Sequence, residues 1–267
     1  MDPAAALPTL NQLRQTLAGI DPSHAPRLAG VERLVTIDAP IDAILGGGLS
    51  CGAFHEFAPK APMHLAATSG FATALAARAS GDRRQMLWIT TDYAAGEGGG
   101  PYGPGIDLFG MTSARLLMLR VAKPVDVLWA MEEALRCRAL ACVIAELTAD
   151  GAAADLTATR RLALAAREGV SAQNSGFGLL IRHKATAMPS AAATRWEIAA
   201  APSRPDAYGG LGRARFDLSL CKNRRGPSGR WIIEWDHHER AFQQAVPVVM
   251  AAPAFDRPDR TARVRAG

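Results

Sequence analysis

The chain has 267 residues and a formal net charge of +5, and 49% of its residues are hydrophobic. No apolar run is long enough to cross a bilayer, and residues 1–10 lack the basic segment and apolar stretch of a secretory signal, so we expect a cytoplasmic protein. The four cysteines show no C-x-x-C spacing, which argues against a zinc site or a disulfide framework.

Three segments are expected along the chain. Leu10, Leu13 and Leu17 fall on one stripe of a helix, and two prolines and a glycine follow in residues 21–30, so residues 1–30 are predicted to form a short helix and a linker. Residues 31–244 are predicted to form the core. The alanine-, proline- and arginine-rich residues 245–267 are predicted to form a flexible tail.

The first half of the core is predicted to alternate strands and helices. Strands are expected at residues 52–57, 63–67 and 86–91, with a helix at residues 71–79 between the last two. Residues 68–70 would then form the loop that leads from a strand into this helix.

The alternation continues with strands at residues 116–119, 139–147 and 177–183, separated by two helices, the second capped by Asp155. This pattern is typical of a largely parallel sheet with helices on both faces. After Thr194 the pattern changes to antiparallel strands at 195–200, 215–222 and 230–236. The expected fold class is therefore α/β, mainly a parallel sheet flanked by helices and ending in antiparallel strands, with Trp231, Trp235 and Phe242 in the core.

The stretch from Leu65 to Thr73 lies where a nucleotide-hydrolysing protein would carry its phosphate loop. A working loop ends in Gly-Lys-Ser/Thr, whose lysine reaches the phosphates and whose hydroxyl holds Mg²⁺. Here Gly70 is followed by Phe71 and Ala72. We therefore predict a protein without ATPase activity and without a cofactor.

Two motifs suggest a family. Residues 41–57 read Ile-Asp-Ala-Ile-Leu-Gly-Gly-Gly-Leu-Ser-Cys-Gly-Ala-Phe-His-Glu-Phe, and residues 222–224 read Lys-Asn-Arg. Both resemble elements of the RecA core, over about residues 31–242. The Gly-Gly-Gly-Leu and Gly-Ala-Phe-His-Glu motifs, with a phosphate loop that lacks lysine, resemble more closely the ImuA family. This family consists of RecA-like proteins of the SOS-induced translesion mutagenesis system.

The resemblance implies a vestigial nucleotide site. Thr68, Ser69 and Gly70 would match the backbone cradle for phosphate, Phe71 the position of the lysine and Ala72 that of the Mg²⁺ ligand. Helix N-termini of this kind retain some affinity for anions.

Two carboxylates would complete this site. Asp92 would match the glutamate that activates water, and Glu146 the Walker B aspartate, while Arg182 and His183 fall at the sensor positions. The other interpretation is that Asp92 and Glu146 are strand-end residues left over from the fold. His55-Glu56 and His237-His238 are adjacent pairs, whose side chains would point to opposite faces of a strand, so no metal site is predicted.

Binding of DNA by these residues is uncertain from the sequence. The segments at residues 148–154 and 184–193, which match the DNA-binding loops of RecA, look short and contain no aromatic side chain for stacking. Basic residues gather instead near the C-terminal hairpin and would contact DNA or an acidic partner, or form a solvated face: Arg213, Arg215, Lys222, Arg224, Arg225 and Arg230.

The resemblance implies a non-catalytic adaptor in SOS-induced translesion synthesis. Its expected partners are the ImuB-like Y-family protein, an error-prone replicative-type DNA polymerase subunit and RecA itself. One alternative is an ATP-dependent, recombinase-like DNA-binding protein that uses Asp92 and Glu146. Another is a SulA-type cell-division inhibitor, although such proteins are much shorter.

Overall fold

The computed structural model describes residues 33–80, 85–148, 154–169, 176–184, 187–205 and 210–245. The chain separates into two compact units, Met1–Arg33 and Leu34–Gly267. The predicted N-terminal helix and linker lie outside the described residues, as does the predicted tail apart from Ala245. No helix in the described part is long and apolar enough to cross a membrane.

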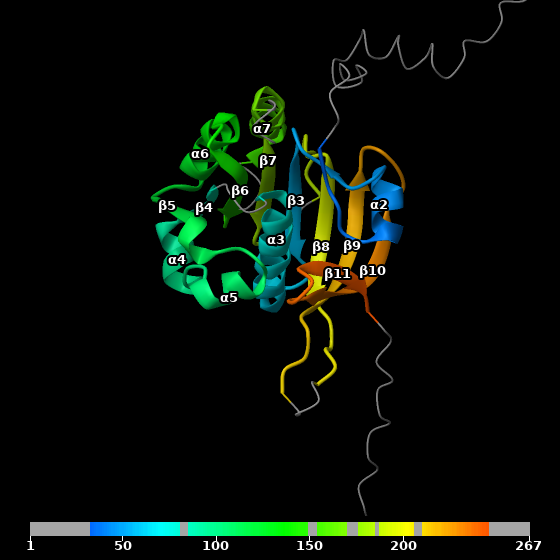
Figure 1. Cartoon of the computed structure of the whole chain (residues 1–267). Coiled ribbons are helices and arrows are strands. Elements are labelled where there is room, and N and C mark those ends of the chain that lie inside the picture. The colour runs from blue at the N-terminus through cyan, green and yellow to red at the C-terminus, as the bar shows by residue number, and fades with distance from the viewer. Residues whose placement is uncertain are drawn as a thin grey trace, which may run out of the picture. The chain divides into compact units, whose positions relative to one another are not determined.

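The second unit is built on a nine-stranded sheet with the order β11-β10-β9-β8-β3-β7-β6-β4-β5 (Figure 1). The six strands from β8 to β5 run parallel to one another. They are β8 (Thr194–Ala200), β3 (Phe54–Pro59), β7 (Phe177–Arg182), β6 (Leu140–Leu147), β4 (Gln85–Thr91) and β5 (Leu116–Val121). The remaining strands continue from β8 as antiparallel neighbours, namely β9 (Arg215–Asn223), β10 (Gly229–Asp236) and β11 (Ala241–Gln244).

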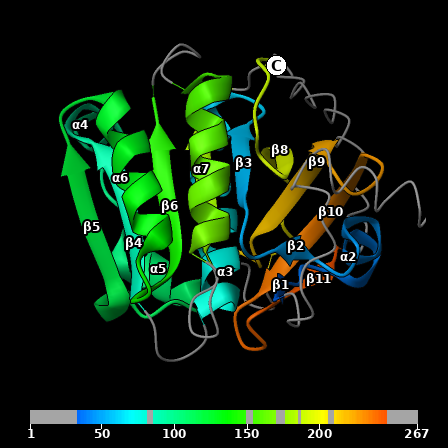
Figure 2. The ribbon, with the colours of Figure 1, turned by 90° about the horizontal axis from the view of Figure 1, so that it is seen from above.

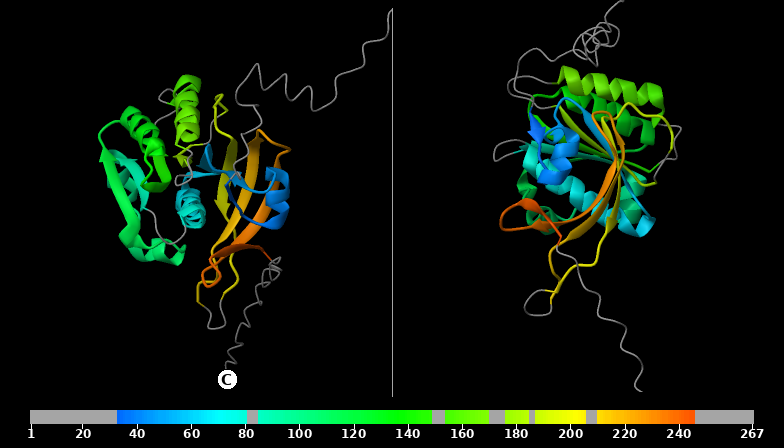
Figure 3. Two further views of the ribbon diagram at one scale, coloured as in Figure 1. Left: turned by 45° about the horizontal axis from the view of Figure 1, so that its top comes forward. Right: turned by 90° about the vertical axis from the view of Figure 1, so that its right-hand side faces the viewer.

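Helices cover both faces of the parallel part (Figure 2). One face carries α3 (Leu65–Ser80), α4 (Asp92–Gly98) and α5 (Gly103–Leu108), and the other carries α6 (Pro124–Arg136) and α7 (Leu156–Glu168). The antiparallel strands curve away beside α2 (Ala39–Leu45) and the small sheet of β1 (Leu34–Val35) and β2 (Leu49–Ser50) (Figure 3). This arrangement confirms the expected α/β fold class.

Local signals in the sequence account for several of these elements. The Asp155 side chain accepts a hydrogen bond from the backbone N–H of Ala158 at 2.7 Å, which confirms the predicted N-cap of α7. β6 is an apolar run that is buried along nearly all its length, as expected between two helical layers. Trp235 and Phe242 are buried and Trp231 packs half-buried against the same core, as predicted.

The prediction for residues 63–67 is wrong. These residues form no strand: a 3₁₀ turn, η2 (Pro62–His64), leads directly into α3 at Leu65. Thr68, Ser69 and Gly70 consequently lie inside this helix and not in a loop. A short apolar run can be a strand or a buried helix, and here the many alanines around it favour the helix.

Phe71 and Ala72 are buried completely by the packing of α3 on the sheet. The ring of Phe71 lies 5.6 Å, 5.6 Å and 5.2 Å, between centroids, from the rings of Phe57, Phe216 and Phe242. The helix is thus joined through one aromatic side chain to β3, β9 and β11.

His55 fixes β3 to its neighbours on the same face. Its Nε2 lies 3.1 Å from the Ser50 carbonyl oxygen, which can only accept, so Nε2 carries the proton. Its Nδ1 therefore accepts from the Thr194 hydroxyl at 2.8 Å, and this hydroxyl in turn accepts from Trp196 Nε1 at 2.8 Å. Complete burial lowers the pKa of His55 from 6.5 to about 4.

The folded protein should therefore lose stability as His55 becomes protonated. Because the pKa of His55 is lower in the folded chain than in the unfolded chain, the unfolded chain binds the proton first. The stabilisation of the folded state by neutral His55 is therefore complete above pH 6.5 and is lost as the pH falls toward 4. The free energy of unfolding should fall by on the order of 3 kcal/mol over this range. Urea unfolding between pH 4.5 and 7.5 measures it. His55→Gln, whose amide can both donate and accept, should flatten the dependence, and an unchanged slope in that variant would contradict the assignment.

Candidate functional site

A cavity of about 570 Å³ lies beside α3 at the carboxyl ends of β4, β6 and β7. Its walls come from the first turns of α3, from the segment between β4 and α5, and from the ends of β6 and β7. The lining residues that matter for its chemistry are Ser69, Gly70, Thr73, Trp88, Glu146 and His183. This volume is in the range of ligand sites. Its lining includes Ser69, Gly70 and Glu146, three of the residues that the sequence assigns to a nucleotide site.

The polar groups of this cavity are acidic or neutral. Glu146 Oε2 accepts a hydrogen bond from Thr90 Oγ1 at 2.8 Å. Burial lowers the pKa of His183, although the neighbouring Glu146 carboxylate opposes the shift, so the imidazole is uncharged at neutral pH. No lysine or arginine of the described residues lines the cavity.

Gly70 allows an aromatic ring to pack directly against α3. A Cβ at this position would lie 2.8 Å from Cζ of Phe109, whose ring packs directly on the helix. The ring of Phe109 also lies against Phe216 and Trp235. In this structure the glycine makes room for an aromatic ring, whereas the sequence suggested that it makes room for phosphate.

The segment between β3 and α3 offers little to an anion. It consists of residues 60–64, with no glycine, and Pro62 has no backbone N–H. The N–H groups of Lys60, His64 and Leu65 already donate to carbonyl oxygens. The Lys60 ammonium is bound to Asp217 Oδ2 at 2.8 Å.

The remaining residues of the predicted nucleotide site are dispersed. Phe71 and Ala72 belong to the core. Asp92 stands at the start of α4, is largely exposed and pairs with Arg120 at 3.3 Å. Neither Asp92 nor Arg182 lines the cavity, whereas Glu146 and His183 do.

A buried ionic network was missed by the sequence analysis. The carboxylate of Glu56, on β3, accepts hydrogen bonds from Arg182 Nη2 at 2.9 Å, Ser190 Oγ at 2.8 Å and Arg195 Nε at 2.8 Å. Burial alone would raise the pKa of Glu56, but the charge of Arg182 and the hydrogen bonds outweigh it and hold the pKa below its ordinary value. Arg182 therefore holds neighbouring strands together and is not available as a sensor.

The predicted basic cluster divides along β9 and β10. Arg213 and Arg215 lie where β9 begins and pair with Glu234, while Arg230 forms two hydrogen bonds to Asp217, at 2.8 and 2.6 Å. The charges of Arg213, Arg215 and Arg230 are therefore neutralised locally.

The other members of the cluster lie at the opposite end of β9. Lys222 Nζ donates to the Ser190 carbonyl oxygen, and Arg224 and Arg225 are exposed in the turn between β9 and β10. Contact of these residues with DNA or a partner stays a prediction.

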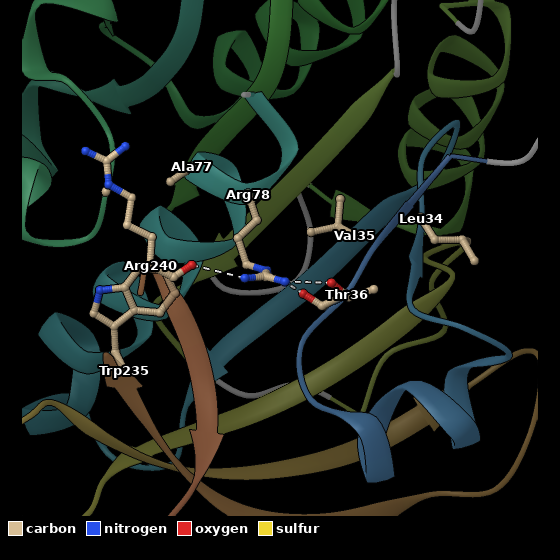
Figure 4. Close-up of a pocket in the computed structure, with 8 residues that line it drawn as sticks. Leu34, Val35, Thr36, Ala77, Arg78, Trp235 and Arg240 are labelled. Atoms are coloured by element: carbon tan, nitrogen blue, oxygen red, sulfur yellow. Dashed lines mark hydrogen bonds between the residues drawn. The ribbon is translucent and has the colours of Figure 1, made fainter. Parts of the chain in front are cut away.

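A second cavity, of about 370 Å³, lies between β1, the end of α3 and the turn before β11 (Figure 4). Arg78 fills much of its wall. Its guanidinium donates to the Thr36 carbonyl oxygen at 2.8 Å, to Thr36 Oγ1 at 2.6 Å and to the Arg240 carbonyl oxygen at 3.0 Å. With these bonds Arg78 connects α3 to the segment that follows β1 and to the turn before β11. This role identifies Arg78 as a structural residue.

Comparisons with known proteins relate the chain to a family by sequence and to a solved structure by fold. The chain is 32% identical over 204 residues to Protein ImuA of two Caulobacter vibrioides strains, NA1000 / CB15N and ATCC 19089 / CB 15, and the match covers 71% of this chain and 77% of the relatives. A crystal structure of the RadB recombinase superposes with a TM-score of 0.54 and 14% identity, covering 80% of this chain and all of RadB. No protein-family model matches.

Gly70→Ala tests whether the glycine is needed to make room for the ring of Phe109. We expect the added methyl to displace the ring and lower the free energy of unfolding by about 1–2 kcal/mol, because overpacking outweighs the better helix propensity. In a Phe109→Ala background the same substitution should be neutral or stabilising by up to about 1 kcal/mol. Denaturant unfolding of the four proteins measures this coupling, and a cost that persists without the ring would refute the explanation.

Proposed function

Because this chain belongs to the ImuA family and has a RecA-like fold, we propose that it serves SOS-induced translesion synthesis as a non-catalytic accessory protein in the cytoplasm. It would act through contacts with other proteins of the mutagenesis system. The observation that carries the proposal is the chemistry of the connection between β3 and α3. Residues 60–64 contain no glycine and no Gly-Lys-Ser/Thr ending at the place where a phosphate loop would have to be.

Three features of this region disfavour ATP chemistry. Phosphate binding requires a cradle of free backbone N–H groups and a cation, but residues 60–64 contain a proline and use the N–H groups of Lys60 and His64 internally. The ammonium of Lys60 is engaged by Asp217. The cavity beside α3 contains the Glu146 carboxylate and no described cation, so it would repel a triphosphate.

Catalysis that depends on Mg²⁺ is disfavoured as well. Stabilising the charge on a transferring phosphoryl group depends on the metal and on a positioned lysine. The positions that the resemblance assigns to these groups, Phe71 and Ala72, are inside the core. Without the lysine and the hydroxyl, Glu146 would have neither a phosphate nor a metal to act on.

The proposed partners follow from the family. They are the ImuB-like Y-family protein, an error-prone replicative-type DNA polymerase subunit and RecA. A protein with the RecA fold that does not cycle through nucleotide states would hold a docking surface in one conformation, which suits an adaptor.

The first test is nucleotide binding and turnover. At 1 mM ATP and Mg²⁺ we expect no heat of binding by calorimetry and no hydrolysis above background, with a RecA-type recombinase as the positive control. Phe71→Lys/Ala72→Thr should not create activity, because both side chains are buried; the variant should instead unfold, since an unpaired lysine cannot be buried without a large cost. Wild-type hydrolysis that is abolished by Glu146→Gln would overturn the proposal.

The second test is recovery of partners. Tagged full-length chain, expressed in DNA-damaged cells of its own host, should retain the ImuB-like protein or the error-prone polymerase subunit. Deletions of residues 1–30 and 245–267 would show which terminus is needed. Recovery of neither protein by full-length chain would count against the assignment.

A further inference from the structure

The cavity beside α3 contains a buried hydrogen-bond donor without an acceptor in the described part of the chain. Trp88, on β4, is 2% exposed and its side chain lines this cavity. Its indole Nε1–H is buried and has no hydrogen-bond partner among the described residues. Buried tryptophans usually find an acceptor for this group, because a donor left unsatisfied costs about 1–3 kcal/mol. An acceptor that enters the cavity from outside the chain would remove this cost.

Two further polar side chains lie beside Trp88. Trp88 pairs with Ile144 on β6, so Glu146 stands two residues further along the neighbouring strand and points to the same face. Glu146 pairs with Ile181 on β7, and His183 follows two residues later. Because all three side chains line the cavity, they form a diagonal row across the ends of β4, β6 and β7.

These groups determine what a ligand must offer. The indole N–H of Trp88 can only donate, and the Glu146 carboxylate can only accept. Thr90 Oγ1 donates to one oxygen of this carboxylate at 2.8 Å, and no described lysine or arginine lines the cavity to neutralise it. His183 Nε2 is also buried without a partner in the described chain, and it can donate or accept according to its tautomer. A matching ligand therefore carries both an acceptor and a donor.

The rest of the lining is suited to an apolar ring. Ile106 and Phe109 form part of the wall, together with Met63 and Tyr102, whose side chains are 83% and 73% exposed. The glycines of residues 98–100 complete it, and a Cβ at any of them would meet no atom within 4 Å. Small-molecule sites combine apolar walls of this kind with a few polar groups that orient the ligand.

We propose that this cavity binds a small, uncharged aromatic molecule that carries an amide group. The amide oxygen would accept from Trp88 Nε1, the amide N–H would donate to Glu146, and the ring would lie against the apolar wall. A carboxylate ligand would be repelled by Glu146, and an amidinium ion would leave the Trp88 N–H without an acceptor. Binding of such a molecule is independent of the proposed role in mutagenesis.

A matched set of small ligands tests this assignment on the full chain. Benzamide, benzamidine and benzoate share one ring and differ in charge and in hydrogen-bonding groups, while acetamide carries the amide without the ring. We expect benzamide to bind with a Kd of about 1 mM, in the range for a ligand of its size, and the other three to bind about tenfold more weakly or less. In ¹H–¹⁵N NMR spectra the Trp88 indole proton, identified by its loss in Trp88→Phe, should move downfield with benzamide as it forms a hydrogen bond.

Two variants separate the two contacts. Trp88→Phe keeps a ring but removes the N–H, and should weaken benzamide about tenfold. Glu146→Gln removes the charge and should raise the affinity for benzoate about tenfold relative to benzamide. This second response decides the question even where Trp88→Phe fails to fold. Trp129→Phe on α6 and Glu239→Gln in the turn before β11 change exposed residues, serve as matched controls and should leave every Kd unchanged.

Three results would rule out a ligand of this class. An indole resonance of Trp88 that does not move at about 10 mM benzamide would mean that water alone satisfies these groups. Binding of acetamide or benzoate as tight as that of benzamide would remove the role of the ring or of Glu146. Binding that is unaffected by both Trp88→Phe and Glu146→Gln would place the benzamide elsewhere on the protein.

Discussion

The packing of α3 across the sheet constrains the rest of the structure. Phe71 touches β3 through Phe57 in the parallel part, and β9 and β11 through Phe216 and Phe242 in the antiparallel part. Fully buried aromatic side chains of this kind contribute several kcal/mol to stability. The helix that brings Phe71 to this junction begins at Leu65. Residues 60–64 remain between β3 and the helix, and they contain neither the glycines nor the Gly-Lys-Ser/Thr ending with which a phosphate loop encloses a phosphate.

A second constraint acts through β3, whose two faces each bury a polar residue. His55 connects the strand to Ser50 and Thr194 on the side of α3, and Glu56 binds Arg182 and Arg195 on the opposite side. Buried ion pairs seldom add much net stability, but removing one partner leaves a buried charge and is costly. The network therefore fixes the register of β3 against β7 and β8 more than it strengthens the fold. That register positions the carboxyl ends of the strands, and with them the cavity beside α3.

The sequence predicted the fold well because strand and helix signals are local. The alternation of apolar runs and the N-cap at Asp155 needed no knowledge of distant residues. The error at residues 63–67 arose where the apolar run was short and where the expectation of a phosphate loop favoured a preceding strand. The site was harder to predict. Glu56 and Arg195 are far apart along the chain, and their pairing depends on β8 lying next to β3. Equally, nothing near Gly70 in the sequence reveals the ring of Phe109 above it.

The distribution of charge connects these features to function. The chain is cationic overall, with a net charge of +5, yet Lys60, Arg182, Arg195 and Arg230 are each bound to a carboxylate. Positive charge that is neutralised within the fold contributes little to the binding of phosphate groups. The cavity that would correspond to a nucleotide site contains the Glu146 carboxylate and no described cation, while Leu117, Met118 and Leu119 of β5 expose apolar side chains at the margin of the sheet. Among the described residues, this distribution of paired cations and exposed apolar side chains is the physical basis of the proposal that the chain acts through contacts with other proteins.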